Sequence, residues 1–235
     1  FGPFGNPYYN SVISTFSHQI SRNIPTKIEI DGKLNLIYVG ELVNEILNKA
    51  KNSINESFCP VPHTSSSSVS EILNLLKYYK NEYNDAGNIP KLKSTYELNL
   101  FNTFRSYIDL DNHFPFKLKE HKDNRGSFVE IIRLGIGGQF SFSTTNSGIT
   151  RGNHFHTRKI ERFSVIRGKA LIQLRKIGTN KIYEFYLDGK TPSFVDMPIW
   201  YTHNIKNIGD EVLLTNFWIN EAYDPNDSDT FFENV

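Results

Sequence analysis

The chain has 235 residues, with 26 Lys or Arg and 25 Asp or Glu, and a formal net charge of +1. This near balance offers no basic excess for a nucleic acid, and no run of about 18 apolar residues is present to span a membrane. The single cysteine, Cys59, excludes a disulfide within the chain and fits a reducing compartment, so we expect a cytoplasmic protein. The chain opens without a signal-peptide pattern and without Met, and we interpret it as part of a longer protein.

Residues 1–112 carry mainly helical periodicity. Val12, Phe16 and Ile20 stand four positions apart, as on one face of a helix, and similar spacing recurs further along. The predicted helices are residues 8–21, 41–51 and, in part, 91–110. Three extended runs are predicted as short strands, at residues 27–30, 34–39 and 58–61. This part is therefore expected to be an α+β domain.

A run of four serines at residues 65–68 admits two interpretations. As a low-complexity stretch it would be a flexible linker. As a helix start, Ser68 would cap a backbone amide while Glu71 reaches back to the backbone of Ser68, which is the capping-box pattern. Because an apolar stripe through Ile72 and Tyr79 follows, we favour an amphipathic helix that faces a protein core.

Strand-like alternation replaces helical periodicity near residue 112. Turn sequences then recur at short intervals, among them Asp188-Gly189 and Gly209-Asp210. Many short strands at this spacing are typical of a β-sandwich or a barrel. We therefore predict a domain boundary near residue 112, with an all-β domain over residues 113–235.

Within the all-β part, residues 148–168 hold a possible metal site. His154 and His156 are two positions apart, so in a strand their side chains share a face. A short turn would bring Glu161 to the start of the next strand, and His203, in a later strand-like run, is a candidate fourth ligand. Three imidazoles and one carboxylate suit a borderline divalent metal such as Zn²⁺. A His-x-His pair is also common on half-exposed strands that bind no metal, and the residues alone leave both interpretations open.

The same stretch resembles the cupin family of β-barrels. Five residues fit the first cupin signature, G-x5-H-x-H-x4-E-x6-G: Gly148, His154, His156, Glu161 and Gly168. Three residues fit the second signature: Pro198, His203 and Asn207. Trp200 stands where that signature has Gly, and a Trp would be strained at a positive φ. The resemblance implies a jelly-roll barrel whose metal ligands are His154, His156, Glu161 and His203.

Three aromatic residues of this part could serve as packing groups or as binding groups. The residues are Phe155, Trp200 and Trp218. Large aromatic rings stabilise a fold most when they are buried. We therefore expect them in the barrel core, not on a stacking platform for a ligand.

Residues 1–112 resemble the C-terminal, substrate-binding part of extended short-chain dehydrogenase/reductases that act on nucleotide sugars. The resemblance rests on Phe1-Gly2-Pro3, on Asn10-Ser11 and on residues 34–42, LNLIYVGEL, and it implies that Asn10 and Ser11 contact the substrate. Residues 1–112 contain no G-x-x-G-x-x-G phosphate cradle and no Tyr-x-x-x-Lys pair. We therefore expect no NADPH site and no ketone reduction by this chain alone, which an NADPH-consumption assay tests.

Together, the two parts resemble the family of capsular polysaccharide assembling enzymes of the CapF type, along the whole chain. Leu174-Arg175-Lys176-Ile177-Gly178 adds to this similarity, as do Asn220-Glu221 and Asp224-Pro225 near the end. The resemblance implies a bifunctional enzyme. Its zinc-bearing cupin domain inverts C3 of a UDP-4-keto-6-deoxy-N-acetylhexosamine, and its reductase domain then reduces the C4 ketone with NADPH. For this chain it implies the epimerase, with the cofactor-binding half of the reductase missing.

Epimerisation beside a ketone needs a base, an acid on the opposite face and a stabiliser for the enolate oxygen. Residues 123–130 resemble the D-x-R-G-x-F-x-E stretch of dTDP-sugar 3,5-epimerases, which implies a substrate contact for Arg125. Tyr201 and Lys159 are candidate acids or bases, and His154 becomes a candidate base if no metal binds. A zinc with four protein donors is usually structural, so the role of the metal stays open at this point.

Two other classes of function fit the same residues. Three His and one Glu also hold iron or copper in cupin dioxygenases, which bound iron with oxygen uptake would favour. A non-catalytic sugar-binding or dimerisation module would bind a UDP-sugar tightly without catalysing exchange. Because cupin barrels often pair through edge strands, we also expect a homodimer.

Overall fold

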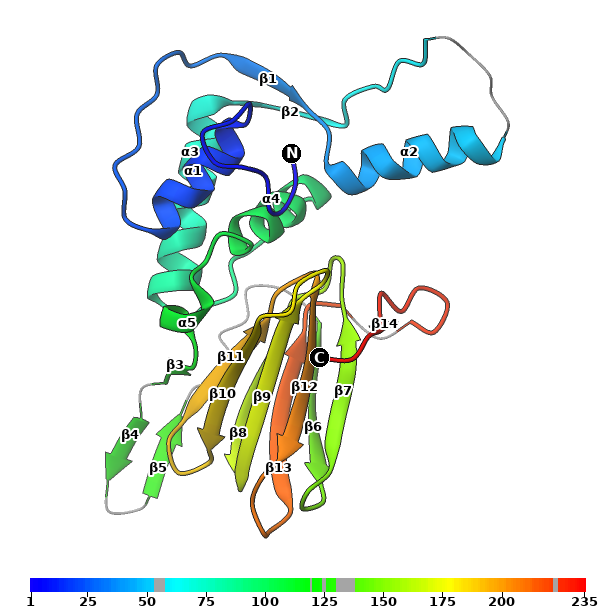
Figure 1. Cartoon of the computed structure of the whole chain (residues 1–235). Coiled ribbons are helices and arrows are strands. Elements are labelled where there is room, and N and C mark those ends of the chain that lie inside the picture. Colours follow the sequence, from blue (N-terminus) through cyan, green and yellow to red (C-terminus); the bar gives the residue numbers. More distant parts are fainter. Residues whose placement is uncertain (53–57, 119, 124–125, 130–137, 222–223) are drawn as a thin grey trace. The chain divides into compact units, whose positions relative to one another are not determined.

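A computed structural model of the chain describes residues 1–52, 58–118, 120–123, 126–129, 138–221 and 224–235 (Figure 1). The chain divides into two compact units. The first unit comprises Phe1–Ala86 and Leu92–Ile108, and the second comprises Gly87–Lys91 and Asp109–Val235. The chain therefore crosses between the units three times, after Ala86, after Lys91 and after Ile108.

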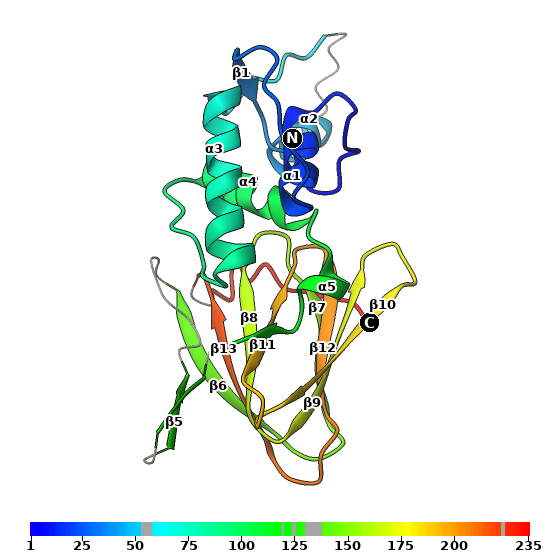
Figure 2. The ribbon, with the colours of Figure 1, turned by 90° about the vertical axis from the view of Figure 1, so that its left-hand side faces the viewer.

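The first unit is a small helical assembly with one short hairpin-like sheet. Its elements are α1 (Val12–Ser21), β1 (Lys33–Leu36), α2 (Val39–Lys51), β2 (Ser65–Ser68), α3 (Val69–Tyr79), the π-helix η1 (Lys80–Asp85) and α4 (Thr95–Arg105). Helices α1, α3 and α4 lie side by side (Figure 2) and bury apolar side chains between them. The core includes Ile13, Phe16, Ile72, Leu76, Leu100 and Phe104.

The helices predicted from apolar spacing are present, with shifted ends. Helix α1 begins at Val12, four residues later than predicted, because the side chain of Ser11 accepts a hydrogen bond from the Ser14 N–H at 3.2 Å and so caps it. Helix α2 begins at Val39, two residues earlier than predicted. The predicted strands at residues 27–30 and 58–61 are wrong, since neither segment has strand structure.

The serine run combines a strand and a helix cap. Ser65–Ser68 forms β2, which pairs antiparallel with β1. The last serine also caps α3, because the Ser68 hydroxyl accepts from the Glu71 N–H at 3.1 Å while Glu71 accepts from the Ser68 N–H at 2.8 Å. The predicted capping box is thus confirmed, and the flexible-linker interpretation is wrong.

Helix α2 differs from the other long helices of this unit in its burial. None of its side chains is buried, and four apolar ones are exposed: Val39, Val43, Ile46 and Leu47. In the described part of the chain, no helix combines the length and the apolar character that crossing a membrane requires.

The second unit is built on two five-stranded antiparallel sheets that face each other (Figures 1 and 2). One sheet has the order β10-β9-β12-β7-β14 and the other β3-β11-β8-β13-β6. Their strands are β3 (Phe116–Lys117), β6 (Gln139–Thr145), β7 (Thr150–Phe155), β8 (Glu161–Arg167), β9 (Lys169–Lys176), β10 (Ile182–Asp188), β11 (Ser193–Met197), β12 (Tyr201–Asn207), β13 (Leu213–Ile219) and β14 (Phe231–Phe232). A short helix, α5 (Leu110–His113), precedes them, and β4 (Glu120–Asp123) pairs with β5 (Gly126–Val129). The predicted all-β architecture of this part of the chain is confirmed, since two facing sheets form it.

Strand alternation fills the space between the two sheets. Along β9, Ala170, Ile172 and Leu174 alternate with partly exposed residues and are themselves fully buried. In the opposite sheet, Val165 of β8 and Leu213 of β13 are also buried. The same inward-facing pattern on β7, β8 and β12 carries the polar residues of the candidate site.

A buried ion pair lies on β8 and β11. Arg162 and Asp196 form a two-pronged pair, with N–O distances of 2.8 and 3.0 Å, and both side chains are essentially inaccessible. The Arg162 guanidinium also lies 3.7 Å from the centre of the Phe194 ring and donates to the Gly87 carbonyl at 2.5 Å. Gly87 has φ +70°, and a Cβ there would lie 2.7 Å from the Phe116 ring, so this position needs glycine. These contacts hold the segment Gly87–Lys91 to the barrel.

Candidate metal centre and cavity

The four predicted ligands come together inside the barrel. His154 is on β7, His156 follows it, Glu161 begins β8 and His203 is on β12. One ligand atom from each residue lies within 4.8 Å of the others. The pairing of β12 with β7, which places His203 directly opposite His154, joins the two sequence signatures across the sheet.

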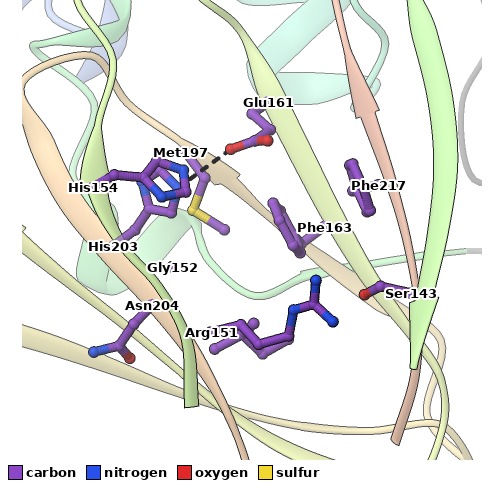
Figure 3. Close-up of a pocket in the computed structure, with 11 residues that line it drawn as sticks. Ser143, Arg151, Gly152, His154, Glu161, Phe163, Met197, His203, Asn204 and Phe217 are labelled. Carbon is purple, nitrogen blue, oxygen red and sulfur yellow. Dashed lines mark ion pairs between the residues drawn. The ribbon is translucent and has the colours of Figure 1, made fainter. Parts of the chain in front are cut away.

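Glu161 contacts two of the three histidines of this His/Glu cluster. Its Oε2 lies 3.2 Å from Nε2 of His156 and 3.2 Å from Nε2 of His203. All three side chains are buried, whereas His154 is only partly buried. Figure 3 shows the Glu161 carboxylate directed toward the paired rings of His154 and His203.

Electrostatics in the cluster favour an ionised Glu161 carboxylate and a neutral His154 imidazole. Burial would raise the pKa of Glu161, but its contacts with His156 and His203 outweigh burial and hold the pKa well below the usual range. Burial, reinforced by the charge of His203, lowers the pKa of His154 to about 4. Burial also opposes protonation of His156, yet the neighbouring Glu161 carboxylate raises its pKa overall.

The geometry fits a divalent metal. Donor atoms around a tetrahedral zinc with bonds of about 2.0–2.2 Å lie roughly 3.3–3.6 Å apart. The two distances of 3.2 Å to Glu161 are close to that spacing. His203 Nε2 is buried and has no hydrogen-bond partner, because its approach to Glu161 lacks the direction that a hydrogen bond needs. A buried imidazole nitrogen without such a partner is costly unless an ion takes its lone pair.

A cavity of about 220 Å³ opens beside the cluster, between the two sheets. His154, Glu161 and His203 form one part of its wall, and Phe163 and Phe217 form an apolar part with rings stacked 5.3 Å apart. The remaining lining residues are Ser143, Arg151, Gly152, Met197, Asn204 and Ile205. In Figure 3 the Arg151 guanidinium extends toward Ser143, away from the cluster, so the cavity has the His/Glu cluster at one end and a cationic group at the other.

Trp200 adopts the conformation that the sequence made doubtful. Its φ is +62°, so the turn keeps the left-handed backbone of the missing glycine. The Trp200 N–H donates to the carbonyl of His156 at 2.8 Å, which ties this turn to a predicted ligand. The Trp200 ring stacks on the Phe155 ring, with 5.6 Å between the ring centres. The Phe155 ring in turn stacks on the Phe231 ring, with 5.3 Å between the centres.

The expected burial of the aromatic residues is only partly right. Trp218 is fully buried, as expected for the barrel core. Trp200 is 36% exposed, so its assignment to the core is wrong. The physical reason is the alternation along β7: because His154 faces the cavity, Phe155 faces outward, and Trp200 stacks on that outer ring.

The other predicted catalytic residues lie outside the cavity wall. Tyr201 is 8% exposed, sits 6.3 Å from the Tyr183 ring, and has its pKa raised to about 12 by burial. Lys159 is buried, and its backbone N–H donates to Asp229. Neither lines the cavity, and their assignment as acid or base stays a prediction.

The predicted substrate contacts are spread over other regions. Arg125 lies outside the described residues. Asn10 is exposed, with φ +51°, and precedes the cap of α1. Ser11 lines a different cavity, of about 300 Å³, within the first unit. Asn10 does not line that cavity, and the substrate-binding roles of these residues stay predictions.

Several residues that line the cavity are marked only weakly by local sequence patterns. Phe163 stands two positions after Glu161, so strand alternation alone places it on the same face. Arg151 stands three positions before His154, so strict alternation would place it on the opposite face, and no local pattern predicts the register shift between His203 and Asn204. Phe217 and Met197 come from strands whose pairing with β8 no local pattern reveals.

Comparison with known proteins supports a single family along the whole chain. Residues 121–231 match the family model described as polysaccharide biosynthesis C-terminal domain. The chain is 32% identical, over 98% of its length, to the UDP-2-acetamido-2,6-beta-L-arabino-hexul-4-ose reductase of Pseudomonas aeruginosa, and it spans 62% of that protein.

Solved structures give the same result. The capsular polysaccharide assembling protein CapF from Staphylococcus aureus is 37% identical, with a TM-score of 0.50, and the match covers 100% of this chain and 69% of CapF. A structure of CapF with the inhibitor 3-isopropenyl-tropolone is also 37% identical, at a TM-score of 0.50, over 100% of this chain and 68% of CapF. The chain thus belongs to the family of the capsular polysaccharide assembling protein CapF.

Proposed function

We propose that this chain is a metal-dependent nucleotide-sugar epimerase of capsular polysaccharide synthesis. Its reaction would invert C3 of a UDP-4-keto-6-deoxy-N-acetylhexosamine. The observation that carries the proposal is the cluster of three His and one Glu beside a cavity between the sheets, with His154, Glu161 and His203 in the cavity wall. The name of the 32% identical reductase supports the substrate class, because it describes a UDP-linked 2-acetamido hexos-4-ulose.

The two ends of the cavity suit the two ends of such a substrate. A volume of about 220 Å³ is below the range of roughly 300–1,000 Å³ that holds drug-sized ligands, so the sugar would enter and the nucleotide would stay outside. Arg151 offers a planar cation for the diphosphate. The stacked rings of Phe163 and Phe217 offer an apolar wall for the deoxy end of the sugar.

Inversion at C3 removes a proton beside the ketone and returns one to the opposite face. A divalent ion held by His156, Glu161 and His203 would supply a Lewis acid for the negative charge on an oxygen. His154 lines the cavity and is the least buried of the four donors, so we assign it the proton transfer at C3. With only three protein ligands, the ion would keep one coordination position open, as catalytic zinc sites do, whereas a zinc with four protein ligands is usually structural.

The inhibitor of the related CapF structure adds support. Tropolones carry a carbonyl and a hydroxyl on adjacent carbons, a pair of hard oxygen donors that chelates divalent metals. The related protein was solved with 3-isopropenyl-tropolone. We propose that the same class of compound binds this chain at the His/Glu cluster.

Solvent exchange tests the proposal directly. The full chain, loaded with Zn²⁺, is incubated with the UDP-4-keto sugar in D₂O, and deuterium at C3 is followed by NMR. Deuterium incorporation that His203→Ala abolishes together with metal binding would support the epimerase. His154→Gln should keep the metal and lose at least about 100-fold in exchange, the usual scale for an acid–base residue.

Three results would count against it. Absence of exchange by the metal-loaded parent chain would remove the proposed reaction. Equal exchange by His203→Ala would remove the role of the cluster. Bound iron with oxygen uptake, and no deuterium exchange, would indicate that the site belongs to a dioxygenase.

We also propose that the first unit derives from the substrate-binding part of a nucleotide-sugar reductase. The support is the similarity of the whole chain to the Pseudomonas reductase and the cavity beside Ser11. The expected absence of ketone reduction by this chain alone, and the expected homodimer, stay predictions.

A further inference from the structure

A C-terminal strap runs along the barrel beside the candidate metal centre. We define it as residues 229–234, which include β14, and Figure 1 shows β14 beside β7. From this strap we propose that Asp229 is a positioning residue, which fixes the orientation and tautomer of His156 as a metal ligand. The inference rests on the metal site of the proposed function.

The first support is a direct bond to the ligand. Nδ1 of His156 lies 2.6 Å from the main-chain carbonyl oxygen of Asp229, and both groups are buried. A carbonyl oxygen only accepts, so Nδ1 must carry the hydrogen. The lone pair of the neutral ring is then on Nε2, the atom that lies 3.2 Å from Glu161 in the cluster. Partners of this kind commonly fix the tautomer of metal-binding histidines.

The second support is how the Asp229 carboxylate is held. It accepts from the backbone N–H groups of Thr157, Arg158 and Lys159, each at 3.0 Å, and from the Thr157 hydroxyl at 2.6 Å. One carboxylate oxygen also lies 3.3 Å from the Thr157 nitrogen. Successive N–H groups form a concave anion site, and here a side chain of the strap fills it. The turn that follows His156 is therefore fixed to the residue whose carbonyl orients the His156 ring.

The third support is the backbone of Asp229 itself. Its φ is +40°, a conformation that non-glycine residues rarely adopt. Only 5% of the residue is exposed, so the many bonds of its carboxylate can hold this conformation. The left-handed backbone aims the carbonyl at His156, and the side chain secures it.

Other contacts hold the strap and its approach without touching the ligand. Arg158 pairs with Asp227 at 2.9 Å, and the Thr202 hydroxyl donates to the Glu233 carbonyl. Arg175 pairs with Glu233 at 2.9 Å. Asp227 is thus a matched control, because it is an acidic residue two positions away that binds the same turn from outside the cluster.

Metal binding by the full chain separates positioning from general stability. Zn²⁺ affinity is measured by competition with a chromophoric chelator for the parent, Asp229→Ala, Asp229→Asn and Asp227→Ala. We expect Asp229→Ala to lose about 10–100-fold in affinity, the usual effect of removing such a partner. Asp227→Ala should stay within about threefold of the parent. Asp229→Asn keeps an acceptor and tolerates positive φ, so it should recover part of the loss.

The visible spectrum of bound Co²⁺ supplies a readout that a merely structural role would not move. If His156 loses its orientation, the intense bands of a four-coordinate site should weaken in Asp229→Ala and persist in Asp227→Ala. The Asp229→Asn variant keeps this test available if Asp229→Ala does not fold.

Two outcomes overturn the inference. Parent-like affinity and Co²⁺ spectrum in Asp229→Ala would show that His156 needs no help from Asp229. Equal losses of Zn²⁺ affinity in Asp227→Ala and Asp229→Ala would mean that both variants act only by destabilising the strap. A parent chain that binds no metal would instead overturn the proposed function, so the two failures are distinct.

Discussion

Arg162 and Asp196 show how a charged pair is accommodated in an apolar barrel. Both side chains are almost fully buried, and the guanidinium is satisfied by the carboxylate, by the Gly87 carbonyl and by the face of Phe194. Such a pair is not by itself a source of great stability, because desolvation of the two charges offsets their attraction. Replacing only one member of the pair is nevertheless costly, since the other charge stays buried without its counter-charge.

Arg162→Met should therefore destabilise the second unit by about 3–5 kcal/mol. The double variant Arg162→Met with Asp196→Leu should recover much of that loss, because neither charge of the pair is then buried. Urea unfolding followed by tryptophan fluorescence measures both, since Trp200 and Trp218 are the two tryptophans of the chain and lie in this unit. A double variant as unstable as the single one would contradict this explanation.

Trp200 carries a backbone conformation that its side chain does not favour. Its φ of +62° replaces the glycine of the second cupin signature, while its ring stacks on Phe155. Both Trp200→Gly and Trp200→Ala remove the ring, but only Ala keeps the backbone strain. We expect the Gly variant to be more stable than the Ala variant by about 1 kcal/mol, measured by urea unfolding with Trp218 fluorescence. Equal stabilities would mean that the turn relaxes once the ring is gone.

At this scale, how much the sequence reveals depends on the distance between partners. His154, His156 and Glu161 are close in sequence, and strand alternation predicts their common face. His203 lies far from them in sequence and could be predicted only from the second signature. The pairing of β12 with β7 explains why it lies beside His154. Asp229 could not be predicted, because its bond to His156 joins residues 73 positions apart and no local pattern specifies where the strap returns.

Helix α3 begins with a local interaction that titrates. Hydrogen bonds from the Ser68 backbone and from the hydroxyls of Ser67 and Ser68 lower the pKa of Glu71 below its ordinary value of 4.5. A lowered folded-state pKa means that the ionised carboxylate stabilises the fold above the unfolded pKa. That stabilisation is lost as the pH falls below about 4.5 and through the folded pKa.

Glu71→Gln isolates this contribution, since glutamine can complete a capping box but does not ionise in this range. The parent should melt at a higher temperature than the variant at pH 7, and the difference should shrink as the pH is lowered from 5 to 3. Circular dichroism of the helices gives the melting temperatures. A difference that stays constant across this range would rule out the carboxylate as its source.

At the scale of elements, periodicity predicted the helices better than the strands. Apolar spacing and the Ser68–Glu71 box specify α1, α3 and α4 locally. Residues 27–30 and 58–61 have strand-forming character but no strand structure, whereas the serine run forms β2 because β1 pairs with it. A strand depends on distant pairing, so propensity alone could not distinguish these three segments.

At the scale of the whole molecule, the proposed metal should stabilise one unit and not the other. An ion that binds only the folded barrel adds about 2.7 kcal/mol when its free concentration is 100 times its dissociation constant. Chelation should therefore lower the melting temperature seen by tryptophan fluorescence and leave the helical transition seen by circular dichroism in place. His203→Ala, which lacks a ligand, should not respond to the chelator. A fluorescence transition that the chelator leaves unmoved in the parent would contradict a stabilising ion.

The segment Gly87–Lys91 has a consequence for the modularity of this chain. It belongs to the barrel unit by packing, although the flanking residues on both sides belong to the helical unit. A barrel excised at Asp109 would lack the carbonyl that Arg162 binds and the glycine that fits against Phe116. The two units are therefore interleaved, and recombination at one point between Ile108 and Asp109 could not transfer the barrel intact to another protein. A polypeptide that starts at Gly87 keeps these contacts, and we expect its barrel, residues 109–235, to resist proteolysis better than the barrel of one that starts at Asp109.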